Sequence, residues 1–194
     1  MDEFDKIVDR WNLKQHPFYK AWSAGTLPIS SLREYVSEWA GFIAEVPSGW
    51  TTLGIHDHAL EEVEHVGLWH EFATEIQVKI PKEPQGAGGQ LLCDTAQRLF
   101  SDRNTAIGAL FAFEAQQPET ATEKLIGLKD HYGQLATSGR YFAVHSDDYG
   151  EAAQLKKLIE PLGDDAKDSA KSACNEMGRA LWVALSDIHS TTQV

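Results

Sequence analysis

Acidic and imidazole side chains lie within segments whose apolar residues follow a helical pattern. In "ALEEVEHVGLWHEF" (residues 59–72), a helical wheel places Glu61 and His65 on one face. The same face carries Leu68 and Phe72, which would make it the buried one. The pattern therefore predicts that one carboxylate and one imidazole of this segment point into the protein.

Two later segments have the same character. In "GALFAFEAQ" (108–116), Glu114 falls within about 60° of Leu110 and Phe111 on the wheel. In residues 141–162, the apolar face is expected to carry further ionisable groups, namely His145 and Asp148, with Glu151 towards its edge. Three separate helices are thus predicted to turn acid or imidazole groups towards the core.

These groups would need a partner inside the protein, because burying an unpaired carboxylate is costly. Basic side chains are scarce on the same faces, and the set contains no thiolate. Such imidazole and carboxylate ligands suit iron or manganese, as in the carboxylate-bridged di-iron sites of helical bundles. Simpler interpretations stay open. Glu61 and His65 could form a hydrogen-bonded pair, Glu114 could pair with Lys124, and the acids of residues 141–162 could be solvated.

The elements that position these groups are predicted to be helices throughout. Period-3.6 patterning dominates and convincing period-2 alternation is absent, so the expected fold class is all-α. Residues 1–194 are expected to form one domain, a single helical bundle. Helices are predicted over residues 3–12, 16–24, 30–55, 57–77, 89–101, 104–132, 137–161 and 165–190.

Cap and turn signals mark several boundaries of these helices. Ser31 and Glu34 have the spacing of a capping box. Pro47 and Pro118 fall inside long helical patterns and are expected to kink them. The one clear loop covers residues 79–90, which are rich in proline and glycine.

Composition and charge exclude several classes of function. The net charge of −12 disfavours nucleic acid as a partner, because its phosphates need a basic surface. No apolar run is long enough for a membrane span and no signal peptide is visible, so a cytoplasmic location is expected. Cys93 and Cys174 lack CxxC spacing and are interpreted as small buried residues, not as disulfide partners or zinc ligands.

Four stretches of the chain resemble the heme-oxygenase-like di-iron oxidases. They are "HPFYKAWSAGTLP", "VGLWHEF", "ALFAFEAQQPETATEKLIGL" and "YFAVHSDDYGEAAQLKKLIE". The strongest resemblance is to the CADD family, which is related to TenA and PqqC, and it covers about residues 14–186. It implies a heme-oxygenase-like bundle of about seven to eight helices around a buried metal site.

The resemblance also implies the ligands and the cofactors. The family holds two metal ions with a Glu and a His on one helix, a Glu on a later helix, and a His, an Asp and a His on another. The corresponding positions here are Glu61, His65, Glu114, His145, Asp148 and Glu151. Only three residues separate Glu61 from His65, where the family has six, and Glu151 stands where the final histidine belongs. Two iron ions, or iron and manganese, are implied, with dioxygen as co-substrate. The glutamate makes the site more anionic, or it weakens one metal position.

The family makes para-aminobenzoate, a folate precursor, by consuming one of its own tyrosines, with a lysine as amino donor. Tyr19 and Lys124 stand at these two positions. The alternatives are that Tyr19 is a packed aromatic residue and that Lys124 is solvated. A further tyrosine of the family appears here as Trp39 or Ala40.

These residues allow three functional hypotheses. The leading one is a non-haem metal-dependent oxidase or oxygenase that acts on a small-molecule substrate or on Tyr19. The second is a metal-free small-molecule enzyme or binding protein like TenA or PqqC, although the TenA nucleophile would lie near Gly108, where there is no cysteine. The third is a non-enzymatic interaction protein. Oligomeric state stays open, with a homodimer as the usual form of self-association.

Overall fold

The protein is an all-α bundle, which confirms the predicted fold class. The structure, a computed structural model, describes residues 2–135 and 137–191. Its helices are α1 (Glu3–Arg10), α2 (Pro17–Ser23), α3 (Ile29–Leu53), α4 (His56–Glu75), α5 (Ala87–Phe100), α6 (Arg103–Glu114), α7 (Gln117–His131), α8 (Arg140–His145), α9 (Gly150–Ile159) and α10 (Asp164–Thr191). Short 3-10 turns at Leu13–Gln15 and Gly133–Leu135 join some of them.

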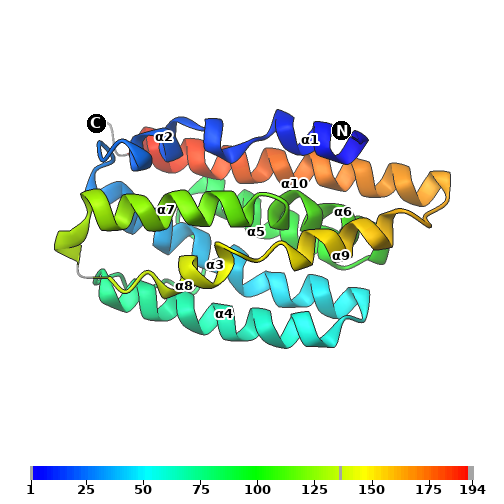
Figure 1. The fold of residues 1–194 in the computed structure, drawn as a ribbon, viewed down its shortest axis with the longest axis horizontal. Helices are drawn as coiled ribbons and strands as arrows, with labels where there is room; N and C mark the ends of the chain where they lie inside the picture. The colour runs from blue at the N-terminus through cyan, green and yellow to red at the C-terminus, as the bar shows by residue number, and fades with distance from the viewer. Residues whose placement is uncertain (1, 136, 192–194) are drawn as a thin grey trace.

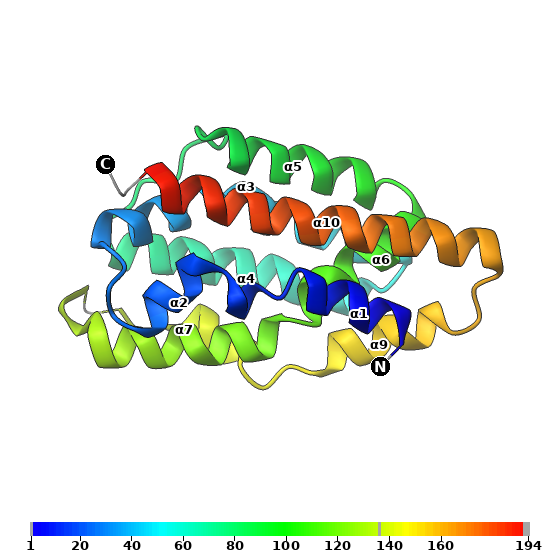
Figure 2. The same ribbon diagram turned by 90° about the horizontal axis from the view of Figure 1, so that it is seen from above.

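The helices run along the long axis of the molecule, with α4 and α10 on opposite sides (Figure 1). Seen from above, α5 and α10 lie together along one edge, and α7 and α9 lie along the other (Figure 2). Helix α3 packs on α4, α5, α6 and α10, while α6 also contacts α7 and α9. Helices α3 and α6 therefore form the centre of the bundle, where a buried site has to be built.

Helix α6 is the most buried element, because every residue from Ala106 to Glu114 is inaccessible to solvent. Such a helix is apolar on all sides, as expected of one that is surrounded by other helices. Gly108 allows α10 to approach it closely, since a Cβ at this position would overlap the carbonyl oxygen of Ala170. A cysteine nucleophile like that of TenA therefore has no room at position 108.

Two predicted helices are each divided in the structure. The predicted helix 104–132 ends at Glu114, and α7 begins at Gln117 with Pro118 in its first turn. Proline suits this position because the first amides of a helix have no intrahelical partner. Pro118 thus starts a helix and does not kink one. The predicted helix 137–161 is likewise divided into α8 and α9 by a turn over residues 146–149.

Other boundary predictions have mixed outcomes. Pro47 lies inside α3, which continues through it to Leu53. The capping box of Ser31 and Glu34 is wrong, because α3 begins earlier, at Ile29, with Pro28 as its N-cap residue. None of the helices in residues 2–135 and 137–191 combines the length and the apolar character that crossing a bilayer requires.

Candidate metal centre and the adjoining lysine

Helix α4 turns a carboxylate and an imidazole into the bundle, but the carboxylate is that of Glu62. Glu62 and His65 are buried at 1% and 6% exposure, and the Glu62 Oε1 lies 2.9 Å from the His65 Nδ1. The side chain of Glu61 is 49% exposed, so its predicted inward orientation is wrong. The buried face is centred near Glu62 and Trp69, about 100° from the direction of Leu68.

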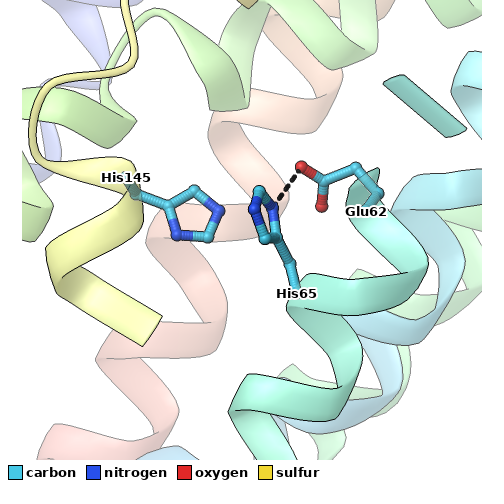
Figure 3. Close-up of side chains that lie close together, drawn as sticks. All are labelled: Glu62, His65 and His145. Atoms are coloured by element: carbon cyan, nitrogen blue, oxygen red, sulfur yellow. Dashed lines mark hydrogen bonds and ion pairs between the residues drawn. The ribbon is translucent and has the colours of Figure 1, made fainter. Parts of the chain in front are cut away.

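His145 ends α8 and faces His65, with 4.3 Å between the ring centroids (Figure 3). Its Nδ1 lies 2.6 Å from the carbonyl oxygen of Tyr141, so this nitrogen carries the proton and donates. The buried Nε2 then has a free lone pair and no hydrogen-bond partner. Burial and the neighbouring His65 lower the pKa of His145 to about 3, which keeps the ring neutral. A neutral imidazole fixed at Nδ1 is the usual form of a metal-binding histidine.

The protonation of His65 is set differently. Burial alone would lower its pKa, but the hydrogen bond and the charge of Glu62 raise it above the ordinary value. Glu61 and Asp148 add negative charge from further away. A cation next to His65 would replace this proton, because a metal ligand must be deprotonated.

Glu114 and Glu151 bring two more buried carboxylates, at 1% and 2% exposure. One oxygen each of Glu62, Glu114 and Glu151 lies within 4.8 Å of the others. Burial and the nearby carboxylates raise the pKa of Glu114 well above its ordinary value and that of Glu151 to about 9. Within the residues that the structure describes, both Glu114 oxygens and the Glu151 Oε1 have no hydrogen-bond partner.

His58 is a further member of the site. Its Nδ1 lies 3.4 Å from the Glu61 Oε2 and 3.7 Å from the Glu151 Oε1, and it makes no hydrogen bond. Its ring packs on that of Trp50 at 4.6 Å. His58 is seven positions before His65, so six residues intervene, and it stands where the resemblance implies a glutamate. That spacing was a signal for His58.

We call His58, Glu62, His65, Glu114, His145 and Glu151 the ligand cluster. Its members fall into three groups: Glu62 with His65 and His145, Glu62 with Glu114 and Glu151, and His58 with Glu151 and the exposed Glu61. The first two groups share Glu62, and the last two share Glu151. Unpartnered buried oxygen and nitrogen atoms are rare in proteins and need an explanation. A hard divalent cation would satisfy them, and carboxylate with imidazole is the donor set of iron and manganese. The ligand cluster is therefore compatible with a metal site.

Asp148 stands apart from the ligand cluster. It lies half-buried in the turn between α8 and α9, where its Oδ1 accepts a hydrogen bond of 2.9 Å from the Gly150 backbone N–H. The prediction that Asp148 lies on a buried helical face is wrong, because the helix is interrupted here. Its charge still contributes to the raised pKa of Glu151.

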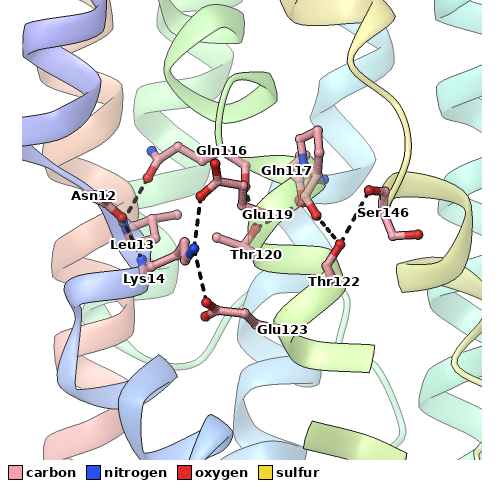
Figure 4. A network of polar contacts seen from close by, with 11 residues as sticks. Asn12, Leu13, Lys14, Gln116, Gln117, Glu119, Thr120, Thr122, Glu123 and Ser146 are labelled. Carbon is pink, nitrogen blue, oxygen red and sulfur yellow. Dashed lines mark hydrogen bonds and ion pairs between the residues drawn. The ribbon is translucent and has the colours of Figure 1, made fainter. Parts of the chain in front are cut away.

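Hydrogen bonds of Gln116 and Thr120 hold the junction between α6 and α7 (Figure 4). The Gln116 Oε1 accepts a hydrogen bond of 2.8 Å from the Leu13 backbone N–H, and its Nε2 donates to the Ala112 carbonyl. Thr120 donates to the Gln116 carbonyl at 2.8 Å, which anchors the first turn of α7. The two helices therefore cannot rotate independently.

Lys124 is buried in an aromatic environment, and the prediction that it could be solvated is wrong. It is 4% exposed, and its Nζ lies 4.8 Å from the centre of the Tyr19 ring. The Nζ also donates a hydrogen bond of 3.2 Å to the Tyr35 hydroxyl, and it lies over the Phe142 ring. The alternative pair with Glu114 is not formed. Burial lowers the pKa of Lys124 to about 7, so a large share of the amine is neutral and nucleophilic near neutral pH.

Tyr19 and Tyr35 form a phenol pair beside this amine. Their rings lie 6.5 Å apart in a T-shaped arrangement, and each hydroxyl group influences the pKa of the other. Burial raises the pKa of Tyr35 well above its usual range and that of Tyr19 in the same direction. The sequence pattern does not single out Tyr35, and the further tyrosine that the resemblance implies falls at Trp39 or Ala40.

Comparison with solved structures identifies the fold class of the chain. A domain of unknown function with a heme oxygenase-like fold from Shewanella denitrificans superposes with a TM-score of 0.77. The match covers 97% of this chain and 91% of that one, at 14% identity. A CADD-like protein of unknown function from Nostoc punctiforme gives a TM-score of 0.62 over 97% and 95% of the two chains, also at 14% identity. The chain therefore has the heme oxygenase-like fold.

The sequence comparison is more specific. A 4-aminobenzoate synthase of Chlamydia pneumoniae is 26% identical over 211 residues, which cover 97% of this chain and 94% of that protein. No family model matches the chain. The resemblance to CADD-like proteins is confirmed by similarity along almost the whole chain and by the fold.

Proposed function

We propose that this protein is a non-haem two-metal oxidase that makes 4-aminobenzoate from its own Tyr19 and Lys124. The relatives at 26–27% identity are 4-aminobenzoate synthases, and they are similar to this chain along nearly its full length. The observation that carries the proposal is the position of Lys124. Its amine lies against the face of the Tyr19 ring and is hydrogen-bonded to a phenol, with no carboxylate partner.

The chemistry of the product explains this arrangement. In 4-aminobenzoate, the amino group is para to a one-carbon substituent, and in tyrosine the hydroxyl group is para to Cβ. Tyr19 can therefore supply the ring and the carboxyl carbon if nitrogen replaces its oxygen and the Cα–Cβ bond breaks. The neutral amine of Lys124 is proposed as the nucleophile for the new C–N bond at the ring carbon that bears the hydroxyl group, and the phenol oxygen leaves as water. The Lys124 Cε–Nζ bond must also break before the free amino group is released. Oxidation of Cβ to a carboxylate and cleavage of the Cε–Nζ bond require an external oxidant, for which dioxygen is proposed.

The ligand cluster would hold two iron ions, or iron and manganese, that activate dioxygen. Glu62, His65 and His145 are proposed to hold one ion, and His58, Glu114 and Glu151 the other, with Glu62 placed between the two groups. Glu61 lies at the rim, 3.4 Å from His58, and is proposed as an outer ligand. The role proposed for Asp148 is to orient the turn that carries Glu151, through its bond to Gly150.

The test uses protein labelled with ring-¹³C tyrosine and, separately, with ε-¹⁵N lysine. The metal-free protein is loaded anaerobically with Fe(II), alone or with Mn(II), and then exposed to dioxygen. We expect two metal ions per chain, oxygen uptake, and 4-aminobenzoate that carries both labels. The Tyr19→Phe and Lys124→Met variants should bind metal normally and give no labelled product.

The matched control is Tyr132→Phe. Tyr132 is also buried, but its hydroxyl bonds the backbone of Leu27 at 3.1 Å and not the amine. This variant should make the product at the wild-type yield. Labelled product from Tyr19→Phe would exclude Tyr19 as the source, and a preparation that binds no iron or manganese would reject the metal-dependent oxidase.

A further inference from the structure

The ligand cluster and Tyr19 are not in direct contact. Within the described residues, no ring contact or hydrogen bond joins Tyr19 to a member of the cluster, since its ring neighbours are Phe18 and Tyr35. An oxidant generated at the metal ions would therefore not touch the Tyr19 ring. If Tyr19 is the group that is oxidised, an electron has to pass through the protein from Tyr19 to the ligand cluster.

Three buried rings fill this interval in an unbroken series. Tyr141 packs on His145 of the ligand cluster with 4.4 Å between ring centroids. Trp69 packs on Tyr141 at 4.7 Å, and Tyr35 packs on Trp69 at 5.5 Å. The last step, from Tyr35 to Tyr19, is 6.5 Å. We call Tyr141, Trp69 and Tyr35 the ring series; each is exposed by 2% or less.

The residue types in the ring series matter as much as their spacing. Phenol and indole rings lose one electron far more readily than a phenyl ring does. Phe142 also packs on Trp69, at 6.3 Å, but it would not be oxidised under the same conditions. Electron transfer through protein weakens steeply with distance, so several short steps between oxidisable rings are faster than one long step.

We propose that Tyr141, Trp69 and Tyr35 relay an electron from Tyr19 to the metal centre. The proposal rests on the proposed function, because the oxidant is dioxygen activated at the metal ions. One electron leaves the Tyr19 phenol and reduces that oxidant by one electron. Each ring of the series is oxidised and then reduced again, so the series itself is unchanged.

The proton of the Tyr19 phenol has a route that leaves the ring series at Tyr35. The Tyr35 hydroxyl, which also influences the pKa of Tyr19, lies 3.2 Å from the Lys124 Nζ. Transfer through the Tyr35 hydroxyl passes one proton to the neutral amine, which releases it again before the C–N bond forms. Loss of the electron and the proton together leaves a neutral phenoxyl radical on Tyr19 and avoids a buried charge on the phenol.

The experiment compares Trp69→Phe with Trp69→Tyr. The first variant interrupts the ring series with a ring that is not oxidised, and the second keeps an oxidisable ring in the same place. Both remove the hydrogen bond of 3.0 Å from the Trp69 indole to the Val36 carbonyl, so they share that loss of stability. The control is Trp39→Phe. Trp39 also packs on Tyr35, at 5.1 Å, but no ring contact between Trp39 and Tyr141 occurs in the described part of the chain.

Three quantities are measured after Fe(II)-loaded or Fe/Mn-loaded protein meets dioxygen. They are the metal content, the mass of the Tyr19 peptide, and the organic radicals trapped by rapid freezing, with ring-deuterated tyrosine to assign them. We expect equal metal content in all proteins. In Trp69→Phe, conversion of Tyr19 should slow by at least about tenfold, and the radical should stay on Tyr141. Trp69→Tyr and Trp39→Phe should convert Tyr19 at nearly the wild-type rate.

Wild-type conversion in Trp69→Phe, with wild-type radicals, would overturn the relay and leave the proposed function intact. A radical that reaches Tyr35 in the wild type but not in Trp69→Phe supports the relay, even if no 4-aminobenzoate is formed. That second pattern would reject the proposed function alone, so the two failures are distinguishable.

Discussion

Glu151 offers a test of the ligand cluster that needs no catalysis. In the metal-free protein its carboxyl group is 2% exposed, and its Oε1 has no hydrogen-bond partner. Burial, with the charges of Glu62 and Asp148, raises its pKa from 4.5 to about 9. The folded protein therefore holds a proton here at pH 7, while the unfolded chain has released it. We expect that Glu151→Gln, which is neutral in both states, stabilises the metal-free protein.

The magnitude is set by the pKa difference. Between 4.5 and 7 the unfolded chain loses the proton that the folded protein keeps, so wild-type stability falls as the pH rises through this interval. About 2.5 pH units at about 1.36 kcal/mol per unit give about 3 kcal/mol at pH 7. Urea denaturation in the presence of EDTA, monitored by helical circular dichroism, measures this gain. At pH 5 the gain should shrink to below about 1 kcal/mol.

Metal should remove most of this difference in stability. Anaerobic Fe(II) or Mn(II) at about 100 times its dissociation constant would stabilise the wild type by about 2.7 kcal/mol, and Glu151→Gln by much less. The control is Glu61→Gln, whose side chain is 49% exposed; its stability without metal should stay within about 0.5 kcal/mol of the wild type. A variant that is no more stable than wild type at pH 7, or that gains as much from metal, would refute the buried ligand cluster.

Three further changes test other parts of the molecule. Lys124→Met should stabilise the protein by about 4 kcal/mol at pH 7 and by little at pH 10, measured by urea denaturation, because the folded amine is neutral above about 7 while the unfolded amine stays charged up to 10.5. Gly108→Ala should lower the free energy of unfolding by about 3 kcal/mol through its clash with α10, whereas Gly67→Ala, in open space on α4, should raise it slightly. His16 caps α2 through its Nδ1, and burial lowers its pKa to about 4. Between pH 7 and pH 5, the free energy of unfolding of the wild type, measured by urea denaturation, should therefore fall by about 2 kcal/mol more than that of His16→Asn. An equal fall in the two proteins would mean that the His16 ring is not held neutral.

The sequence predicts the general architecture well because helical periodicity is strong over most of the chain. It fails at the ends of elements, where local geometry decides. Pro118 is compatible with either a kink or a new first turn, and only the packing of Gln116 against Leu13 selects the second. The turn after His145 contains no proline, and its glycine is at the start of α9, so the pattern gave no reason to divide that helix.

The candidate site shows the same limit at the scale of single residues. His65, Glu114 and His145 lie in the interior as their apolar neighbours predict. The choice between Glu61 and Glu62 depends on a rotation of about 100° around α4, and the half-buried Leu68 draws the predicted face away from Glu62. Tyr35 lies among aromatic residues of α3, where no sequence pattern separates a reactive phenol from a packed one.

The tight seating of Tyr19 in the aromatic interior also bears on the fate of the protein after the proposed reaction. Loss of a phenol ring from so dense a place would leave a void in the middle of the fold, and truncating a large buried ring costs about 3–5 kcal/mol. That is a large share of the stability of an ordinary protein of this size. A protein molecule that has lost the Tyr19 ring would thus unfold more often and become accessible to proteases. Such reacted molecules would be degraded and replaced by newly translated ones.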